Sequence, residues 1–452
     1  MRFLVRDKSF YKSFFRLTLI ISMQALITHA VNLADNVMLG NYSEIGLSGV
    51  AVVNQIQFLL QMTVNGIGGG IVVFGAQYWG KRELEPIRRI ISLGLKLALL
   101  IGVIFFVATK TMPRQIIHIL TNDPQVIEAG LEYLAIMAFT YLTFCISNTL
   151  ILALRSVEVT VIGTVISLVT LVVNVSLNYC LIFGHFGFPE MGITGAAVAT
   201  LASRCVELLV VLVYVFFIDK RLKLRPKHIL NLDFFYLKRF LKVSMPVVAS
   251  GAFWGVAMSA QTAIMGHMSA NVIAASSITG VVFQISSVIG MCSSSSSSVL
   301  IGKVVGSGKM ENIKPYTYTL QFLYVCIGLF CGTMLFILRE PILSLYNISS
   351  DTYSLAVTFM TIQSVSVICS CYEFPVESGI IQGGGSTHYA FMVDTICMWC
   401  LTLPLSFLSA FVWHLPPVWT FIFLRIDQFV KCIPNAITVN RFRWVKEVTK
   451  TK

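Results

Sequence analysis

One carboxylate stands out among the residues that could do chemistry, because it lies in an otherwise apolar stretch. Asp35 belongs to the segment Ala-Asp-Asn-Val-Met-Leu-Gly at 34–40, and a related segment, Ala-Gln-Thr-Ala-Ile-Met-Gly at 260–266, has Gln261 at the acidic position. An unpaired charge in apolar surroundings is costly and is commonly functional. The sequence therefore predicts two related lobes, of which the first, with Asp35, handles a cation.

Amide and hydroxyl groups in the same half are the expected neighbours of Asp35. Asn174 and Asn178 are one helical turn apart, so they share one face of a helix. Their amide oxygens can coordinate a small cation or hold a proton network, and Thr200 offers a further oxygen. Each of these side chains alone is typical of a hydrogen bond between helices. Together with Asp35 they favour a cation site.

The second half offers a different set of candidates. Glu373 and Glu377 flank Pro375, and we expect them on one face of a kinked helix. Asp394 is an isolated acid in an apolar segment. With the aromatic Trp254 and with Gln261, the counterpart of Asp35, these acids are the predicted substrate contacts.

The remaining charges within apolar segments have local interpretations. Arg204 and Glu207 are close enough in sequence to pair on one helix. Lys96 and Lys431 are expected to extend to the cytoplasmic surface.

The elements that position these residues are membrane-spanning helices. The chain has 452 residues, of which 56% are hydrophobic and 12% charged, and its mean hydropathy is +0.80. Soluble proteins carry about 25% charged residues. Twelve apolar runs have the length of about 20 residues that crosses a bilayer: 17–39, 47–76, 89–109, 126–152, 160–183, 193–218, 241–268, 271–301, 317–338, 353–381, 388–412 and 417–438. The predicted fold is an all-α integral membrane protein.

The net charge of +12 reflects topology rather than nucleic-acid binding. If the N-terminus is cytoplasmic, the inner segments hold 26 Lys and Arg residues and the outer segments hold 3. This bias predicts that both termini are cytoplasmic. We expect a multi-pass protein of the cell (inner) membrane, without a cleaved signal peptide.

The repeat extends well beyond the heptapeptide. At the offset that separates Asp35 from Gln261, Gly80 matches Gly306, and Gly68-Gly69-Gly70 matches Ser294-Ser295-Ser296. Each half therefore has six spans, which predicts two pseudo-symmetric six-helix bundles. The expected domains are an N-terminal lobe, a cytoplasmic linker, a C-terminal lobe and a basic cytoplasmic tail, at 1–218, 219–242, 243–440 and 441–452.

Other classes of function lack their signatures. The seven histidines are dispersed and form no motif at metal-ligand spacing, so a membrane-embedded enzyme is disfavoured and no cofactor is expected. A flippase for lipid-linked precursors would need several cations in a central cavity, and few basic residues of the apolar segments could supply them. Transport of small organic molecules across the lipid bilayer is favoured, with no obligate protein partner.

These features together resemble the multidrug and toxic compound extrusion (MATE) family over nearly the whole chain. The resemblance rests on Asp35 to Gly40, Asn174 to Tyr179, Met191 to Thr200, and Gly383 to Thr387 followed by Trp399 and Pro404. It implies a cation-coupled antiporter that expels organic, often cationic, compounds through a cleft between two lobes. It also implies that Asp35 couples the ion, with Asn174, Asn178 and Thr200 around it, and by spacing it adds Tyr133.

The chain departs from the family pattern at the predicted ion site. The family usually has an acid where Asn178 stands, and commonly Arg and Asp where Gln382 and Ser386 stand. The first half also has Ile20 where the family usually has proline, whereas the second half keeps Pro246. With one carboxylate instead of two, the N-terminal cluster favours a proton over Na+.

Overall fold

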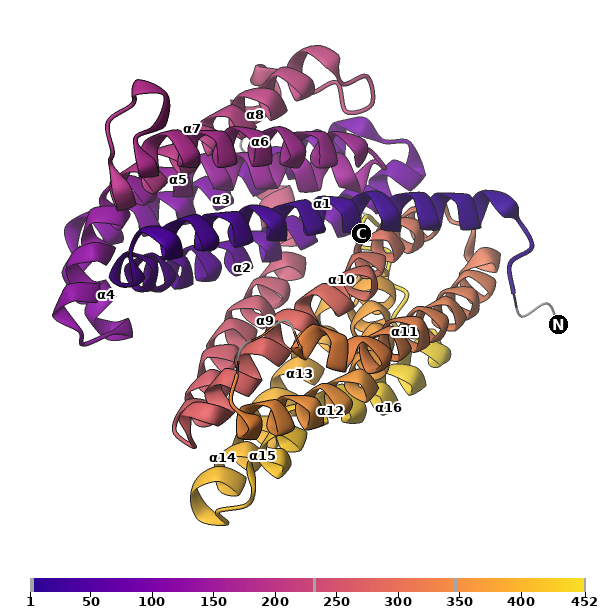
Figure 1. Ribbon diagram of the computed structural model, residues 1–452. Helices are drawn as coiled ribbons and strands as arrows, with labels where there is room; N and C mark the ends of the chain where they lie inside the picture. Colours follow the sequence, from indigo (N-terminus) through magenta and orange to yellow (C-terminus); the bar gives the residue numbers. More distant parts are fainter. Residues whose placement is uncertain (1–3, 231–232, 345, 347, 451–452) are drawn as a thin grey trace. The chain divides into compact units, whose positions relative to one another are not determined.

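The computed structural model describes residues 4–230, 233–344, 346 and 348–450, and these residues form helices without any strand (Figure 1). Eleven helices in these ranges are long and apolar enough to cross a membrane. The ends of the chain beyond 4 and 450, including the last two residues of the predicted tail, lie outside the described residues. The all-α membrane fold predicted from composition is confirmed.

By packing, the chain divides into two compact units. Unit 2 comprises Met23–Gly75 and Glu83–Val248, and unit 1 comprises the described residues up to Ser22, Ala76–Arg82 and those from Ala249 onward. The boundaries after Ser22 and after Val248 fall inside the first helix of each repeat, so each of these two helices contributes to both units. The two boundaries are at equivalent positions of the repeats. The ends of these two helices, which carry Asp35 and Gln261, therefore belong to different units. The lobe and linker boundaries read from the sequence stay a prediction.

Unit 2 is built mainly from the first repeat, and within it α5 packs on α3 and α7, and α6 packs on α7. Its helices are most of α1 (Lys8–Tyr42) and α2 (Glu44–Lys81), then α3 (Leu84–Thr111), α4 (Pro113–Leu120), α5 (Pro124–Ser156), α6 (Val161–Phe183), α7 (Gly192–Val213), α8 (Pro226–Leu230) and the start of α9 (Phe234–Gly266).

Unit 1 is built mainly from the second repeat, and α12 lies against α10, α11 and α16. Besides the rest of α9, its helices are α10 (Ala270–Gly306), α11 (Ile313–Leu343), α12 (Ser350–Phe374), α13 (Thr387–Thr395), α14 (Leu403–Phe407), α15 (Pro417–Leu424) and α16 (Ile426–Arg441). π-helical segments at Pro375–Ile381, Ile396–Thr402 and Leu408–Val412 continue α12, α13 and α14. The last span is broken at Arg425, between α15 and α16.

Equivalent helices of the two repeats begin at equivalent positions. Helices α9, α10, α12 and α13 start at the positions that the repeat makes equivalent to the starts of α1, α2, α5 and α6. Residues that cap these starts are duplicated too, since Ser43 accepts a hydrogen bond from Gly46 N at 3.0 Å and Ser269 accepts one from Val272 N at 3.3 Å. Such side chains satisfy backbone N–H groups that the first turn leaves without partners. The repeated spans are therefore set by local sequence as well as by hydrophobicity.

The matched glycines mark a close contact between α2 and α10, on residues that all belong to unit 1. A Cβ atom on Gly80 would overlap the carbonyl oxygen of Lys303, and one on Gly306 would overlap the carbonyl oxygen of Gln77. The two contacts are related by the repeat, because Gln77 and Lys303 also occupy equivalent positions of the two halves. Small residues let helix backbones approach closely in a membrane. The contact is thus self-complementary, as expected for a pseudo-two-fold relation.

Substitution of this glycine tests the contact. Gly306→Ala is expected to lower the free energy of unfolding in detergent by about 1–3 kcal/mol, because overpacking against a backbone atom cannot be relieved by a rotamer change. Gly280→Ala on the same helix is the matched control, since a Cβ there meets nothing within 4 Å. Equal effects of the two substitutions would contradict the contact.

The C-terminal tail is packed onto unit 1. Trp444 is buried against Gly384, and the Lys446 amide donates to the Gly384 carbonyl at 2.8 Å. Gln77 on α2 makes two hydrogen bonds to the tail backbone. Its side-chain nitrogen donates to the Lys446 carbonyl, and its side-chain oxygen accepts from the Val448 amide. Tail backbone thus satisfies both ends of this buried amide, so the tail is part of the folded unit.

An ion pair makes the docking of the tail sensitive to pH. The Lys81 ammonium lies 2.7 Å from the Glu447 carboxylate and, by donating to it, lowers the pKa of Glu447 below its ordinary value of 4.5. A lowered carboxyl pKa gives stabilisation that is complete above the ordinary pKa and is lost as the pH falls through the lowered one. Hydrogen exchange at the Val448 amide, corrected for the intrinsic rate, should therefore speed up under acid conditions.

The control is Glu447→Gln, which has no carboxyl group to titrate at this position. In this variant, protection of the Val448 amide from hydrogen exchange should not fall under acid conditions through loss of the ion pair. Protection in the unmodified protein that stays constant well below pH 4.5 would show that the ion pair does not hold the tail.

Candidate functional site

Asp35 lies in unit 2, where three helices bring polar side chains to it. Asn178 on α6 donates from its amide nitrogen to the Asp35 carboxylate and also, at 3.2 Å, to the Asn174 side-chain oxygen. Both asparagines are 1% exposed, and their spacing of one helical turn places them together as the sequence predicted. The side-chain oxygen of Asn178 is buried without a hydrogen-bond partner among the described residues.

Tyr133 and Thr200 complete this group. Tyr133 on α5 is buried, its hydroxyl is hydrogen-bonded to Thr200 on α7, and it lies within electrostatic range of Asp35. The structure thus brings together all five residues expected at the ion site, Asp35, Asn174, Asn178, Thr200 and Tyr133. Their role in coupling stays a prediction.

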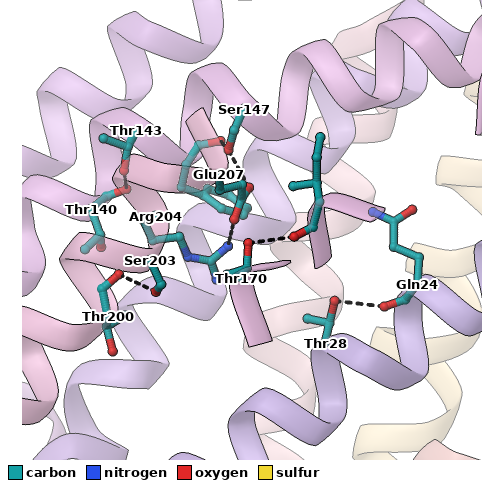
Figure 2. Close-up of polar contacts among 12 residues, drawn as sticks. Gln24, Thr28, Thr140, Thr143, Ser147, Thr170, Thr200, Ser203, Arg204 and Glu207 are labelled. Atoms are coloured by element: carbon teal, nitrogen blue, oxygen red, sulfur yellow. Dashed lines mark hydrogen bonds and ion pairs between the residues drawn. The ribbon is translucent and has the colours of Figure 1, made fainter. Parts of the chain in front are cut away.

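A neighbouring ion pair distinguishes Glu207 from Asp35. Figure 2 shows Arg204 and Ser147 both directed at the Glu207 carboxylate, with Arg204 at 2.7 Å and the Ser147 hydroxyl at 2.6 Å. The Arg204 guanidinium also lies over the Phe144 ring, 5.6 Å from its centroid. The predicted local pairing of Arg204 with Glu207 is present, but sequence spacing carried no sign that Arg204 also lies within electrostatic range of Asp35.

Asp35 differs from Glu207 in its charge balance. Glu207 has a guanidinium partner, whereas Asp35 makes no ion pair with any residue in the described ranges. One arginine faces two carboxylates here, so this region holds one negative charge in excess when both acids are ionised. Binding of one proton or one monovalent cation at Asp35 would neutralise it.

The second group of predicted residues lies in unit 1. Trp254 and Asp394 line one pocket, together with Met398, and the Gln261 amide nitrogen lies 3.3 Å from the Met398 sulfur. Glu377 accepts a hydrogen bond from Asn435 at 3.0 Å. Unlike Asp394, Glu373 and Glu377 are buried behind the pocket and do not line it.

Lys431 corrects an expectation from the sequence. It was expected to extend to the cytoplasmic surface, but its side chain is only 5% exposed and its ammonium lies 2.6 Å from Asp394 and 3.5 Å from Asp427. Electrostatic contributions from Glu373 and Glu377 also reach it. The lysine is therefore paired with two carboxylates inside the protein, which compensates its burial.

Among the described residues, no three His, Cys, Asp or Glu side chains are close enough together to hold a metal ion. Any Na+ at Asp35 would have to be held by one carboxylate and by neutral oxygens. Asn174, Asn178 and the two hydroxyls are donors of that kind, since hard cations prefer oxygen ligands.

Comparison with known proteins identifies the family. The model of the MatE family matches residues 21–180 and 246–408, which is most of the chain and one match in each repeat. The chain therefore belongs to the MatE family, the family that the sequence motifs resembled. It is a multi-pass membrane transporter and not an enzyme.

Individual relatives extend over almost the whole chain. A probable multidrug resistance protein NorM from Listeria innocua serovar 6a is 26% identical over 95% of this chain and 94% of its own length. A MATE crystallised in complex with MaL6 has a TM-score of 0.87 at 17% identity over 97% of both chains. The Vibrio cholerae MATE transporter VcmN in its bent form has a TM-score of 0.85 at 16% identity over 96% of this chain and 97% of its own. The two structures share the fold with this protein.

Proposed function

We propose that the protein is a cation-coupled antiporter, driven by H+ or Na+, that exports organic and often cationic compounds, including drugs, from the cell across the cytoplasmic membrane. Relatives such as the Listeria protein are named as probable multidrug resistance proteins. The observation that carries the proposal here is Asp35, which has no cationic partner among the described residues and accepts from the buried Asn178.

The same group of residues suits the binding and release of a single ion. Asn178 has a buried oxygen without a partner in the described ranges, next to the Asp35 carboxylate. A protonated Asp35 would gain an O–H donor, and rotation of the Asn178 amide would present its oxygen to that donor. A Na+ ion would use the same oxygen together with the carboxylate. The single carboxylate favours the proton of these two ions.

The proposed transport cycle depends on ion and substrate binding differently to two arrangements of the lobes. Substrate enters from the cytoplasm while Asp35 is ionised, and arrival of the ion from outside neutralises Asp35. The neutral group favours a different packing of α1, α6 and α7, in which substrate is released outward. The ion and the substrate must bind the two arrangements of the lobes with different affinities, because equal affinity would shift no equilibrium.

The structure gives less support to the alternative functions. A flippase of lipid-linked precursors would need free cations for a pyrophosphate, but Arg204 and Lys431 are committed to carboxylates. Arg425 lies over the rings of Phe283 and Phe421. An enzymatic role is disfavoured by family membership.

The test of the proposed function is counterflow of a fluorescent organic cation in proteoliposomes, with proton and sodium gradients imposed separately. We expect one of the two gradients to drive export against the substrate gradient. Transport that neither gradient accelerates would contradict ion coupling while leaving transport itself in place.

A further inference from the structure

We propose that Asp394 in unit 1 binds the positively charged group of the transported molecule, and that Lys431 occupies this carboxylate as an internal counter-ion until the substrate replaces it. This inference rests on the proposed export of organic cations and adds where, and by which competition, the charge is recognised. The predicted class of ligand is a monocation whose charged nitrogen carries alkyl or aryl groups.

The pocket beside Asp394 has walls suited to such a ligand. Its cavity volume is about 10 Å³, so a ligand would lie against its exposed rim, and its lining includes Phe253, Trp254 and Trp399. The rings of Phe253 and Trp399 meet edge to face, with 5.9 Å between centroids and 65° between planes, and both side chains are exposed, by 43% and 38%. Aromatic faces attract an organic cation, and aromatic cages are a common means of binding alkylated ammonium groups.

Asp394 supplies the charge at the base of this pocket. Lys431 reaches one carboxylate oxygen at 2.6 Å, and the Ser250 hydroxyl donates to the other at 2.7 Å. The Asp394 side chain is 28% exposed and the Lys431 side chain 5%. The carboxylate is therefore open on the pocket side and contacted by lysine from the protein interior. A ligand can approach Asp394 without first passing Lys431.

Lys431 has a second partner that makes the exchange feasible. Asp427 lies one helical turn before it on α16, at 3.5 Å from the ammonium. When a ligand cation takes Asp394, a small movement of the lysine toward Asp427 keeps the ammonium paired. Arg425 also lies within electrostatic range of Asp427, so Asp427 keeps a positive neighbour whichever carboxylate the lysine contacts.

A hydroxyl in the pocket further defines the ligand. Thr395 lines the same pocket, and its hydroxyl is buried without a partner among the described residues. This oxygen can accept from an N–H group, so protonated amines would gain a hydrogen bond that quaternary ammonium ions cannot make. Anions would meet the Asp394 carboxylate and are expected to be excluded.

The experiment compares trimethylphenylammonium with dimethylaniline, which has one methyl group fewer and is uncharged at neutral pH. Binding is measured by equilibrium dialysis on the detergent-solubilised full chain without an ion gradient. Asp394→Asn should weaken binding of the cation about tenfold, and Lys431→Gln should strengthen it about tenfold, which corresponds to about 1.4 kcal/mol. Trp399→Leu should weaken it about two- to fivefold, as expected for one cation–π contact. Binding of the neutral compound should not follow the Asp394 and Lys431 charge changes.

The opposite signs of the two charge substitutions distinguish competition from general damage to the fold. Lys431→Gln/Asp427→Asn removes the lysine without leaving Asp427 unpaired, and it should bind the cation at least as tightly as the unmodified protein. Arg114→Gln removes an exposed positive charge from unit 2 and is the control. Unchanged or weaker cation binding in a folded Lys431→Gln/Asp427→Asn variant would overturn the inference. Since no gradient is used, that result leaves the proposed ion coupling untouched, and failure of coupled transport would leave this binding pattern untouched.

Discussion

Replacement of Asp35 by asparagine is expected to abolish ion-driven export while leaving the protein folded and able to bind substrate. Asparagine has nearly the same shape as aspartate but cannot be charged, so it removes a carboxylate that, unlike Glu207, makes no ion pair among the described residues. Exchange of one monovalent ion for one monocation moves no net charge, so the ion gradient drives it, and a tenfold gradient supplies about 1.4 kcal/mol. This energy supports a substrate concentration ratio of roughly ten, and the variant should lose that ratio.

The measurement is accumulation of a fluorescent organic cation in inverted membrane vesicles that carry either the unmodified protein or Asp35→Asn. Glu128→Gln is a matched control, because it removes one carboxylate of the same unit from an exposed ion pair. We expect this control to retain the full gradient. Unaltered ion-driven accumulation by Asp35→Asn would remove Asp35 from the coupling mechanism.

The second large effect concerns stability. Arg204→Met would leave Glu207, which is 6% exposed, with the Ser147 hydroxyl and without its guanidinium partner. Removal of one partner of a buried ion pair costs about 3–5 kcal/mol, whereas replacement of both partners by apolar groups is often neutral. Because the Arg204 side chain is 27% exposed, we expect a loss near the lower end, about 3 kcal/mol.

A double-mutant cycle of Arg204→Met and Glu207→Met, with unfolding followed in detergent, measures this coupling. The double variant should be far more stable than the sum of the two single losses implies. It should also keep ion-driven transport, since Asp35 and its amide neighbours are untouched. A stable double variant without coupling would instead assign Arg204 to the ion site.

Two parts of the ion site could be predicted from the sequence itself, and the family resemblance supplied the link between them. Asn174 and Asn178 had to share a face of one helix, and the repeat singled out Asp35 against Gln261. Motif order then connected α1, α6 and α7. Duplicated capping serines mark the starts of α2 and α10 in the structure, a local signal that the apolar runs alone do not show.

Lys431 could not be placed because its depth and direction depend on tertiary contacts. Its span is interrupted at Arg425, so neither the length of the apolar run nor its helical phase locates the lysine. The π-helical segment after Phe374 likewise changes the phase at Glu377, which sequence spacing treated as regular. Arg204 was correctly paired with Glu207, but its proximity to Asp35 depends on how α7 packs beside α1.

The most direct test of the central claim is the number of protons or Na+ ions that leave the purified protein when it binds substrate. Coupling through Asp35 predicts one ion released per substrate bound, since one carboxylate changes its state, and none released from Asp35→Asn. Release of the same number of ions from Asp35→Asn as from the unmodified protein would contradict the account.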